Sequence, residues 1–398
     1  MIRDLSGQGV LAEEVDVLVI GAGTAGMVAA SLLSRQGLVV HCLESGSAEQ
    51  REDTHPLNEC EQVGTYYAGA DHGRFRCLGG TSTRWGGAMI PFQAQDMAPD
   101  LWPIGAEELS PYADRVEELF HLPPGDYADP ALMDGPEFIA RLAKWPPFRR
   151  RNTYNLFRQD ADSPTGPTIW LNATVTRLAL SQGRVSEVAA QAPDGSSIRI
   201  RAKEVILAAG SIESTRLLLL ADRANGGAIS ASSTGLGCYF HDHLSAVVGE
   251  IEAFDRIKLN QRVGFSFAEG GAMRNVRFEL EPASSLRQSV PPCFAHIGFD
   301  DETGGGFDAL RDVFRQLQRR RLPGIKTMLR LVAGAPWLTR AVWWRLARKR
   351  LLYPAETSLK LHMVIEQAAV PGNRISLSDD RVDVYGQPLA RIEWNVSA

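Results

Sequence analysis

Residues 15–44, VDVLVIGAGTAGMVAASLLSRQGLVVHCLE, constrain the fold more than any other stretch of this chain. An apolar run at 15–20 predicts a buried parallel strand, because strands covered on both faces are apolar throughout. The run leads into the glycine turn 21–26, and a helical pattern over 25–36 follows. A second apolar strand then ends on Glu44. Strand, glycine turn, helix, strand and terminal acid is the order of a dinucleotide-binding unit.

Each glycine of the turn has a separate physical role. Gly21 permits the tight turn, Gly23 lets a pyrophosphate approach the backbone, and Gly26 lets the helix pack closely on the strand. The helix N-terminus offers free N–H groups and a partial positive charge to the phosphates. Glu44 lies 23 residues after Gly21 and can accept hydrogen bonds from both ribose hydroxyls, whereas it would repel a 2′-phosphate. The stretch therefore favours FAD or NAD over NADP.

Composition narrows the class of protein. The chain has 398 residues, enough for two domains or for one large domain with a lobe. A net charge of −5 gives no indication of nucleic-acid binding. The five cysteines are odd in number and never form a CxxC pair, which favours a reducing, cytoplasmic compartment and argues against disulfides or a zinc site. Residues 1–14 are predicted to be a polar lead-in without a secretory signal, and residues 15–33 are too interrupted to span a bilayer.

A second glycine-rich stretch occupies residues 74–92, RFRCLGGTSTRWGGAMIPF. Two glycine pairs, Gly79-Gly80 and Gly86-Gly87, flank the hydroxyl-rich segment 81–85. Paired glycines would let backbone N–H groups face a phosphate or a flavin edge. The alternative is a surface turn that exposes Trp85, but four glycines with hydroxyls between them favour a ligand-facing loop.

Residues 93–168 are rich in proline, aspartate and tryptophan, and we interpret them as an excursion out of the nucleotide domain. Short helices are expected within this segment at 106–120 and 137–144. The α/β character then returns, and Asp194-Gly195 is a hairpin signal. Strands are expected at 168–171, 173–180, 185–192, 197–201 and 204–210.

A helix over 212–221 is expected after the last of these strands, with Ser211 as its cap. The small residues at the strand end, 208–210, suit a phosphate neighbour, although many α/β crossovers look the same. His241 and His243 would need further ligands to bind a metal, and a polar loop is the favoured interpretation, so no metal site is predicted. Further strands are expected at 247–254, 276–280, 293–299, 359–367, 374–377, 382–384 and 389–394.

Residues 311–351 carry twelve lysines and arginines against one acid, Asp312, which gives this stretch a net charge of +11 and leaves −16 for the remainder. Apolar residues recur between the basic ones, and breaks at Pro323-Gly324 and at 334–336 predict two or three short basic amphipathic helices. One interpretation is contact with a membrane surface or a partner. The other is a solvated basic face whose apolar side packs on the body of the protein.

Together these motifs resemble the glucose-methanol-choline (GMC) flavoprotein oxidoreductases. The resemblance spans nearly the whole chain and is specific in combination. The sequence GGTSTRWGG at 79–87 is similar to that of the pyranose-oxidase-like, sugar-oxidising branch of the family. The motifs that carry the resemblance are Gly21–Gly26 with Glu44, Leu78–Ser82 with Trp85-Gly86-Gly87, Val205–Glu213, Gly237 with Asp242-His243, and the tail Glu366-Gln367, Asn373-Arg374, Gly386 and Trp394.

The resemblance implies an FAD enzyme that oxidises a sugar or another alcohol by hydride transfer to flavin N5. Pyranose oxidases carry the flavin covalently on a histidine of the second loop. That place is Arg84 here, which implies non-covalent FAD. The implied cofactor contacts are Gly21, Gly23, Thr24, Ala25, Gly26, Glu44, Gly79, Gly80, Thr81, Ser82, Trp85, Gly86, Gly87, Ala88, Val175, Ala209 and Gly210.

The catalytic residue is not identified by the resemblance. Family members continue into a segment with the catalytic histidine, which this sequence lacks, and His241 and His243 do not match that role. We therefore expect the chain to contain the cofactor-binding part of such an enzyme without the catalytic histidine. In this interpretation the enzyme is represented by an incomplete chain. One alternative is a non-catalytic FAD-binding subunit that a second polypeptide completes. Another is an NAD-dependent dehydrogenase, which the second glycine loop disfavours.

The expected fold class is α/β. An FAD-binding Rossmann-like domain is predicted from 1–92 and 169–245. A second, α+β substrate domain on an antiparallel sheet is predicted from 93–168 and 246–398.

Overall fold

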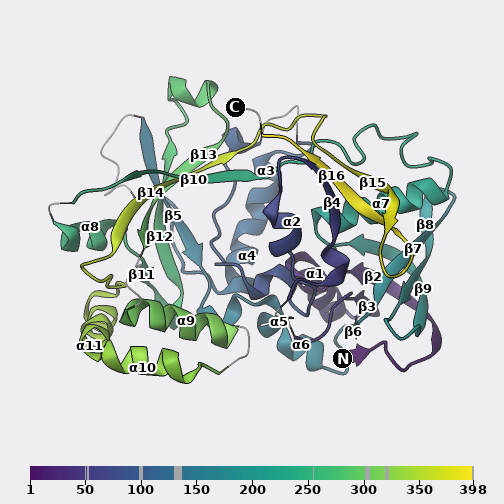
Figure 1. Ribbon diagram of the computed structural model, residues 1–398, viewed down its shortest axis with the longest axis horizontal. Coiled ribbons are helices and arrows are strands. Elements are labelled where there is room, and N and C mark those ends of the chain that lie inside the picture. The colour runs from purple at the N-terminus through teal and green to yellow at the C-terminus, as the bar shows by residue number, and fades with distance from the viewer. Residues whose placement is uncertain are drawn as a thin grey trace. The chain divides into compact units, whose positions relative to one another are not determined.

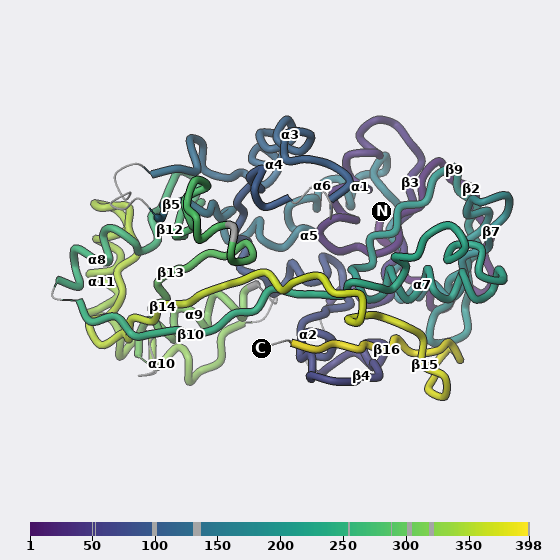
Figure 2. The backbone as a smooth tube through the Cα atoms, turned by 90° about the horizontal axis from the view of Figure 1, so that it is seen from above, coloured from purple at the N-terminus to yellow at the C-terminus, as the bar shows by residue number. Residues whose placement is uncertain are grey.

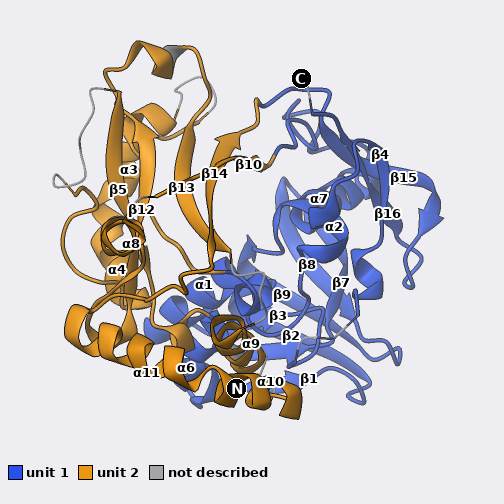
Figure 3. Ribbon diagram, turned by 60° about the vertical axis from the view of Figure 1, so that its left-hand side comes forward, with its two compact units in different colours: residues 1–85, 152–241, 369–398 blue, residues 86–151, 242–368 orange. Residues whose placement is uncertain are grey.

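The computed structural model describes residues 1–49, 51, 53–97, 102–129, 137–253, 255–300, 305–318 and 322–396. They form two compact units, shown in different colours in Figure 3. Unit 1 consists of Met1–Trp85, Asn152–His241 and Ala369–Ala398, and unit 2 consists of Gly86–Arg151 and Asp242–Ala368.

A seven-stranded sheet is the centre of unit 1, in the order β1-β6-β3-β2-β9-β8-β7 (Figure 1). The first five strands of this order are parallel, and β8 and β7 join them in antiparallel pairings. The strands are β1 (Ile2–Asp4), β2 (Val10–Ile20), β3 (Val40–Leu43), β6 (Thr168–Leu171), β7 (Thr174–Ser181), β8 (Arg184–Gln191) and β9 (Ser197–Leu207). The helices of unit 1 are α1 (Thr24–Arg35), α2 (Ala68–His72), α5 (Thr153–Leu156), α6 (Arg158–Asp162) and α7 (Ser211–Ala224), with short 3₁₀ turns η1 (Pro56–Asn58) and η2 (Gly80–Thr83).

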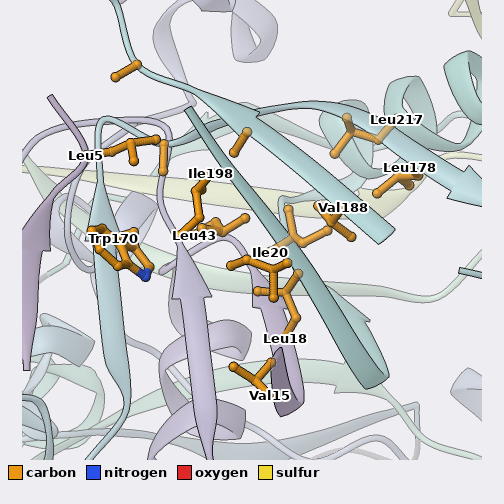
Figure 4. Close-up of a cluster of buried hydrophobic side chains, with 14 of the residues drawn as sticks. Leu5, Val15, Leu18, Ile20, Leu43, Trp170, Leu178, Val188, Ile198 and Leu217 are labelled. Atoms are coloured by element: carbon orange, nitrogen blue, oxygen red, sulfur yellow. The ribbon is translucent and has the colours of Figure 1, made fainter. Parts of the chain in front are cut away.

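The apolar side chains of the parallel strands make the core of unit 1. The last four residues of β2 and all four of β3 are buried, as continuous apolar runs in a sheet covered on both faces should be. Trp170 of β6 and Leu5, which follows β1, belong to the same cluster (Figure 4). This packing fixes the end of β2, and therefore the glycine turn that follows it.

A second, three-stranded sheet in unit 1 has the order β15-β16-β4. It contains β4 (Cys60–Gly64), β15 (Arg374–Val382) and β16 (Pro388–Trp394). The strand β16 pairs in parallel with β4, so the C-terminal residues lie beside a segment near the N-terminus. Tyr67 packs edge-on against both Phe240 and Trp394, with ring centroids 5.3 and 5.1 Å away.

Unit 2 is built on an antiparallel sheet in the order β10-β14-β13-β12-β11, with β5 also paired to β12 (Figure 2). Its strands are β5 (Phe138–Trp145), β10 (His243–Glu250), β11 (Ser266–Phe267), β12 (Met273–Leu280), β13 (Cys293–Asp300) and β14 (Ser358–Glu366). Its helices are α3 (Ala106–Leu109), α4 (Ala113–Phe120), α8 (Arg256–Val263), α9 (Gly306–Gln318), α10 (Ile325–Ala333) and α11 (Ala335–Trp343), followed by a π-helical turn, η9 (Trp344–Arg348). Short 3₁₀ turns lie at η3 (Ala94–Asp96), η4 (Ser110–Tyr112), η6 (Phe148–Arg150), η7 (Glu269–Gly271) and η8 (Ser285–Gln288).

The predicted α/β class and the strand, turn, helix and strand at 15–44 are confirmed. The strands predicted at 168–171, 173–180, 185–192, 276–280, 293–299, 359–367 and 389–394 are also present, within one to three residues of the expected ends. The two strands predicted at 374–377 and 382–384 are instead one strand, β15, which ends at Val382. The strand predicted at 247–254 is β10, which begins earlier, at His243, and ends at Glu250. Phe254, its expected end, lies outside the described residues, as do 319–321 in the basic stretch.

The helix predicted at 137–144 is wrong, because those residues form β5. The segment contains two charged residues, Arg141 and Lys144. In the structure both are buried and paired, Arg141 with Glu279 at 3.0 Å and Lys144 with Glu117 at 2.7 Å. Partners so distant in sequence cannot be seen in a local pattern.

Three smaller predictions are also corrected. The polar lead-in at 1–14 instead contains β1 and the start of β2, which pairs with β9 from Val10 onward. The strands expected at 197–201 and 204–210 are one strand, β9, which pairs with β2 on both sides of Lys203 and ends at Leu207. Ser211 does not cap α7, since the N-cap position is Gly210 and no side chain caps the helix.

The compact units differ from the predicted domain boundaries in four segments. The shortest is 242–245, which lies in unit 2, where β10 pairs with β14. Residues 86–92 lie in unit 2, where Met89 exchanges two backbone hydrogen bonds of 2.8 Å with Lys144 of β5. Residues 152–168 lie in unit 1, where Asp160 pairs with Arg35 of α1 at 2.8 Å. Residues 369–398 lie in unit 1 because β16 pairs with β4.

Across the part of the chain that the structure describes, none of the helices combines the length and apolar character needed to cross a membrane.

Candidate functional site

The first glycine turn joins the end of β2 to α1, and two of its glycines are required by packing. Gly21 has φ +103°, and a Cβ there would lie 2.6 Å from the carbonyl oxygen of Ala208, just after β9. A Cβ on Gly26 would overlap the carbonyl oxygen of Gly21 and would lie 3.3 Å from Val19 Cγ1. The turn is therefore pressed between the helix and the sheet.

Gly23 differs from both, because a Cβ there would meet nothing within 4 Å. It is the N-cap residue of α1, and no side chain caps the first turn of that helix. The N–H groups of Thr24 and Ala25 belong to this turn. Free N–H groups beside an open backbone make the position suitable for an anionic group such as a pyrophosphate.

Glu44 ties the end of β3 to the glycine turn. Its carboxylate is buried, with Oε2 accepting the N–H of Ala22 and Oε1 accepting the N–H of Gly46, each at 2.9 Å. Burial raises the pKa of Glu44, and those two N–H groups and the charge of Arg76 oppose the rise. Each oxygen keeps a lone pair, so the group can still accept ribose hydroxyls.

The first half of the second glycine loop packs directly on the first turn. Gly79 donates its N–H to the carbonyl oxygen of Ala22 at 3.0 Å. A Cβ on Gly80 would lie 2.8 Å from Gly23 Cα. Both glycines have positive φ, +91° and +54°, a conformation that favours glycine. The structure therefore brings the two predicted glycine motifs together at Gly23.

The hydroxyl residues of the loop fall into two groups. Ser82 is buried, and its Oγ lies 2.8 Å from Thr153 Oγ1 of α5, so this side chain anchors the loop. Thr81 is exposed, and its carbonyl oxygen accepts the N–H of Trp85 at 3.1 Å. The end of the predicted loop belongs to unit 2, where Gly86 lies against Trp145 and Gly87 against Pro146. The cofactor contacts predicted for Gly86, Gly87 and Ala88 therefore stay predictions.

A pocket in unit 1 adjoins the first glycine turn. It brings together Gly21, Val175 and Ala209, three residues predicted from the sequence to contact the cofactor. Gly210, the next residue, has φ +78°, and a Cβ there would meet nothing within 4 Å. The remaining lining residues are Ile20, Leu43, Ser45, Leu57, Arg76, Ala173, Thr174, Glu213, Arg216 and Leu217.

A buried ionic network forms the polar side of this pocket. Glu213 of α7 pairs with Arg74 at 3.0 Å, with Arg76 at 2.9 Å and with Arg216 at 3.4 Å. Burial would raise the pKa of Glu213, but Arg76, Arg216 and Arg74 outweigh it, so the pKa lies below its ordinary value. Glu213 is therefore a carboxylate at neutral pH.

The same network also contacts two other parts of unit 1, the residue after Glu44 and the C-terminal loop. Arg76 donates to Ser45 Oγ at 2.9 Å, next to Glu44, and Arg216 pairs with Asp383 of the C-terminal loop at 2.6 Å. None of these arginines is among the cofactor contacts predicted from the sequence. The sequence does hold a usable signal, since Arg74 and Arg76 lie five and three residues before Gly79, and Glu213 and Arg216 are three residues apart on a helix.

The two histidines considered as metal ligands face different partners. His241 in unit 1 has Nδ1 2.7 Å from the carbonyl oxygen of Tyr239, and His243 in unit 2 has Nδ1 2.9 Å from Asp242 Oδ1. Among the described residues no group of three or more histidine, cysteine or acidic side chains is arranged to hold a metal ion.

Known proteins resemble the chain both in the segment of the first glycine turn and along most of its length. Residues 14–55 match the family model described as FAD binding domain. The chain is 23% identical to 2-methyl-1,2-propanediol dehydrogenase from Mycolicibacterium austroafricanum, over 96% of this chain and 77% of that relative. Its fold is similar to the crystal structure of pyridoxine 4-oxidase from Mesorbium loti, with a TM-score of 0.52 and 14% identity over 95% of this chain and 75% of the other.

These matches confirm FAD as the cofactor and the FAD-binding fold. The matched residues contain the turn and the acid whose geometry is described above. The chain is therefore an FAD-binding oxidoreductase.

Proposed function

We propose that this chain is a GMC-type flavoprotein that oxidises a small alcohol, with a sugar as one candidate substrate. The observation that carries the proposal is the junction of the two glycine motifs at Gly23, beside the buried carboxylate of Glu44. Both motifs are features of that family's sequence pattern. The similarity to a diol dehydrogenase and to the fold of a pyridoxine oxidase supports an alcohol substrate.

The described residues fit FAD at three points. The open backbone at Gly23 and the first-turn N–H groups of Thr24 and Ala25 would hold the pyrophosphate. Glu44 would accept the hydroxyls of the adenosine ribose. The pocket at Val175 and Ala209 would take the adenine. When bound, FAD supplies the hydride acceptor.

Arg84 supports non-covalent attachment. Its guanidinium carbon lies 4.9 Å from the ring centre of Phe75, in unit 1. A guanidinium is permanently protonated and is not a nucleophile towards a flavin. Heat denaturation of the holoprotein should therefore release all of its FAD into the supernatant. Flavin that stays with the precipitated chain would contradict this part of the proposal.

The substrate class is tested by anaerobic bleaching of the bound flavin. We would add 2-methyl-1,2-propanediol, pyridoxine, glucose and a simple primary alcohol separately to the FAD-loaded protein. Bleaching by at least one of them supports alcohol oxidation. A protein that holds one FAD per chain and bleaches with none would be a non-catalytic FAD-binding subunit.

Replacement of Glu44 by glutamine should weaken FAD binding about 10–100-fold, because hydrogen bonds to a charged group contribute about 1.5–3 kcal/mol each. FMN lacks the adenosine ribose, so its affinity for the same variant should stay within about twofold of wild type. Both affinities are measured by fluorescence titration of the apoprotein. Equal losses for FAD and FMN would mean that Glu44 only supports the turn through Ala22 and Gly46.

A further inference from the structure

Helix α10 exposes the apolar stripe that a helix normally buries. Ile325, Met328, Leu329 and Val332 follow the spacing of one helix face, and each is exposed, with Ile325 80%, Leu329 64% and Val332 71% accessible. The buried position of this helix is Thr327 instead. The helix therefore turns its apolar side away from the rest of unit 2.

The segment that follows repeats this arrangement. Val342 and Trp343 of α11 and Leu346 of the π-helical turn lie at the same spacing and are exposed, Leu346 by 74%. Trp344 is buried and anchors the turn to unit 2. Figure 1 shows α9, α10 and α11 grouped together at one end of unit 2. We call the exposed side chains Ile325, Met328, Leu329, Val332, Val342, Trp343 and Leu346 the apolar surface.

Basic side chains accompany the apolar surface. Lys326 lies at the edge of the α10 stripe, and Arg340 lies at the edge of the α11 stripe, both exposed. Arg348 lies over the ring of Trp343, with its guanidinium carbon 5.5 Å from the ring centre. Arg345 and Lys349 are also exposed. A stretch with apolar and aromatic residues on one face and cations beside them is typical of helices that lie in a membrane interface.

We propose that α10, α11 and η9 form a docking surface for an anionic lipid bilayer, which they enter as an interfacial segment. Charge complementarity selects this occupant. Residues 311–351 carry +11 and the remainder of the chain −16, so an anionic surface attracts this stretch and repels the rest. A second copy docked through the same face would place the basic residues of two subunits against each other.

Vesicle flotation of the FAD-loaded full chain tests this surface. The vesicles are phosphatidylcholine alone and phosphatidylcholine mixed with phosphatidylglycerol. We expect binding to the mixed vesicles, at least tenfold weaker binding to phosphatidylcholine alone, and loss of binding at high salt. Neutralising Lys326 or Arg340 with glutamine should each lower the partition coefficient about fivefold, which corresponds to about 1 kcal/mol per basic residue.

The decisive variant is the double substitution Leu329→Glu and Leu346→Glu, which should lower partition at least tenfold. Both side chains are exposed, so melting temperature and flavin content should not change. Val384→Glu changes an equally exposed apolar residue in unit 1 and should bind vesicles like wild type. Unchanged partition of the double variant, or no binding of wild type to either vesicle, overturns the proposal. A wild-type dimer that the double variant separates into monomers would assign the surface to a second copy and would overturn it as well.

Discussion

Gly26→Ala is expected to lower the free energy of unfolding by about 3 kcal/mol or more, at the upper end of overpacking effects. The added methyl group would overlap the carbonyl oxygen of Gly21 and would lie 3.3 Å from Val19 Cγ1. The backbone of the turn cannot move away, because it lies between α1 and the sheet. Urea unfolding followed by circular dichroism measures the change. The variant should also lose its flavin, because the displaced turn carries the pyrophosphate site.

Gly23→Ala is the matched control within the same turn. Its methyl group would enter open space, and the φ of Gly23, −78°, suits alanine. The apoprotein should therefore unfold like wild type while binding FAD more weakly, since the methyl group crowds the phosphate approach. Wild-type stability and flavin content in Gly26→Ala would show that α1 does not pack on the turn as described.

Glu213→Gln is expected to destabilise the protein by about 3–5 kcal/mol, because removal of one partner leaves buried charges uncompensated. The Glu213 side chain is only 10% exposed and contacts Arg74, Arg76 and Arg216. Glu204→Gln is the matched control in the same unit. That carboxylate pairs with Arg184 at the surface, where ion pairs contribute little, so its loss should hardly change urea unfolding. Equal effects of the two substitutions would contradict the network described here.

Glu213 also predicts the direction of acid sensitivity. Its pKa in the folded protein lies below the ordinary value of 4.5, so the unfolded chain binds the proton more readily. The stabilisation by this carboxylate is fully present above pH 4.5 and is lost as the pH falls through the folded value. The difference in unfolding free energy between wild type and Glu213→Gln should therefore shrink below pH 4.5. A difference independent of pH would contradict the assignment.

Local sequence was sufficient for the first glycine turn because each of its constraints is local. The spacing of Gly21, Gly23 and Gly26 sets the turn, and the apolar runs on either side require a parallel sheet. Gly23 is predicted to let a pyrophosphate approach the backbone, and the open space beside it leaves room for that approach. The roles of Gly21 and Gly26 were also predicted, although the contact of Gly21 with Ala208 depends on a strand far away in the sequence.

Long-range pairing accounts for what the sequence did not reveal. The structure has the strand β5 where a helix was predicted, and its charged residues Arg141 and Lys144 pair with Glu279 and Glu117, which lie far away in the sequence. The pairing of β16 with β4 joins residues near the two ends of the chain, and no local pattern encodes it. Arg76 was overlooked for the same reason, since its partner Glu213 becomes its neighbour only when α7 packs beside the pocket.

The most direct test of the central claim is titration of the folded apoprotein with FAD and with FMN. The turn at Gly23, the carboxylate of Glu44 and the pocket at Val175 would bind the pyrophosphate, the adenosine ribose and the adenine, and FMN lacks the adenosine and one of the two phosphates. We predict one FAD per chain, bound at least tenfold more tightly than FMN. Equal affinities, or no flavin binding by folded protein, would contradict the account.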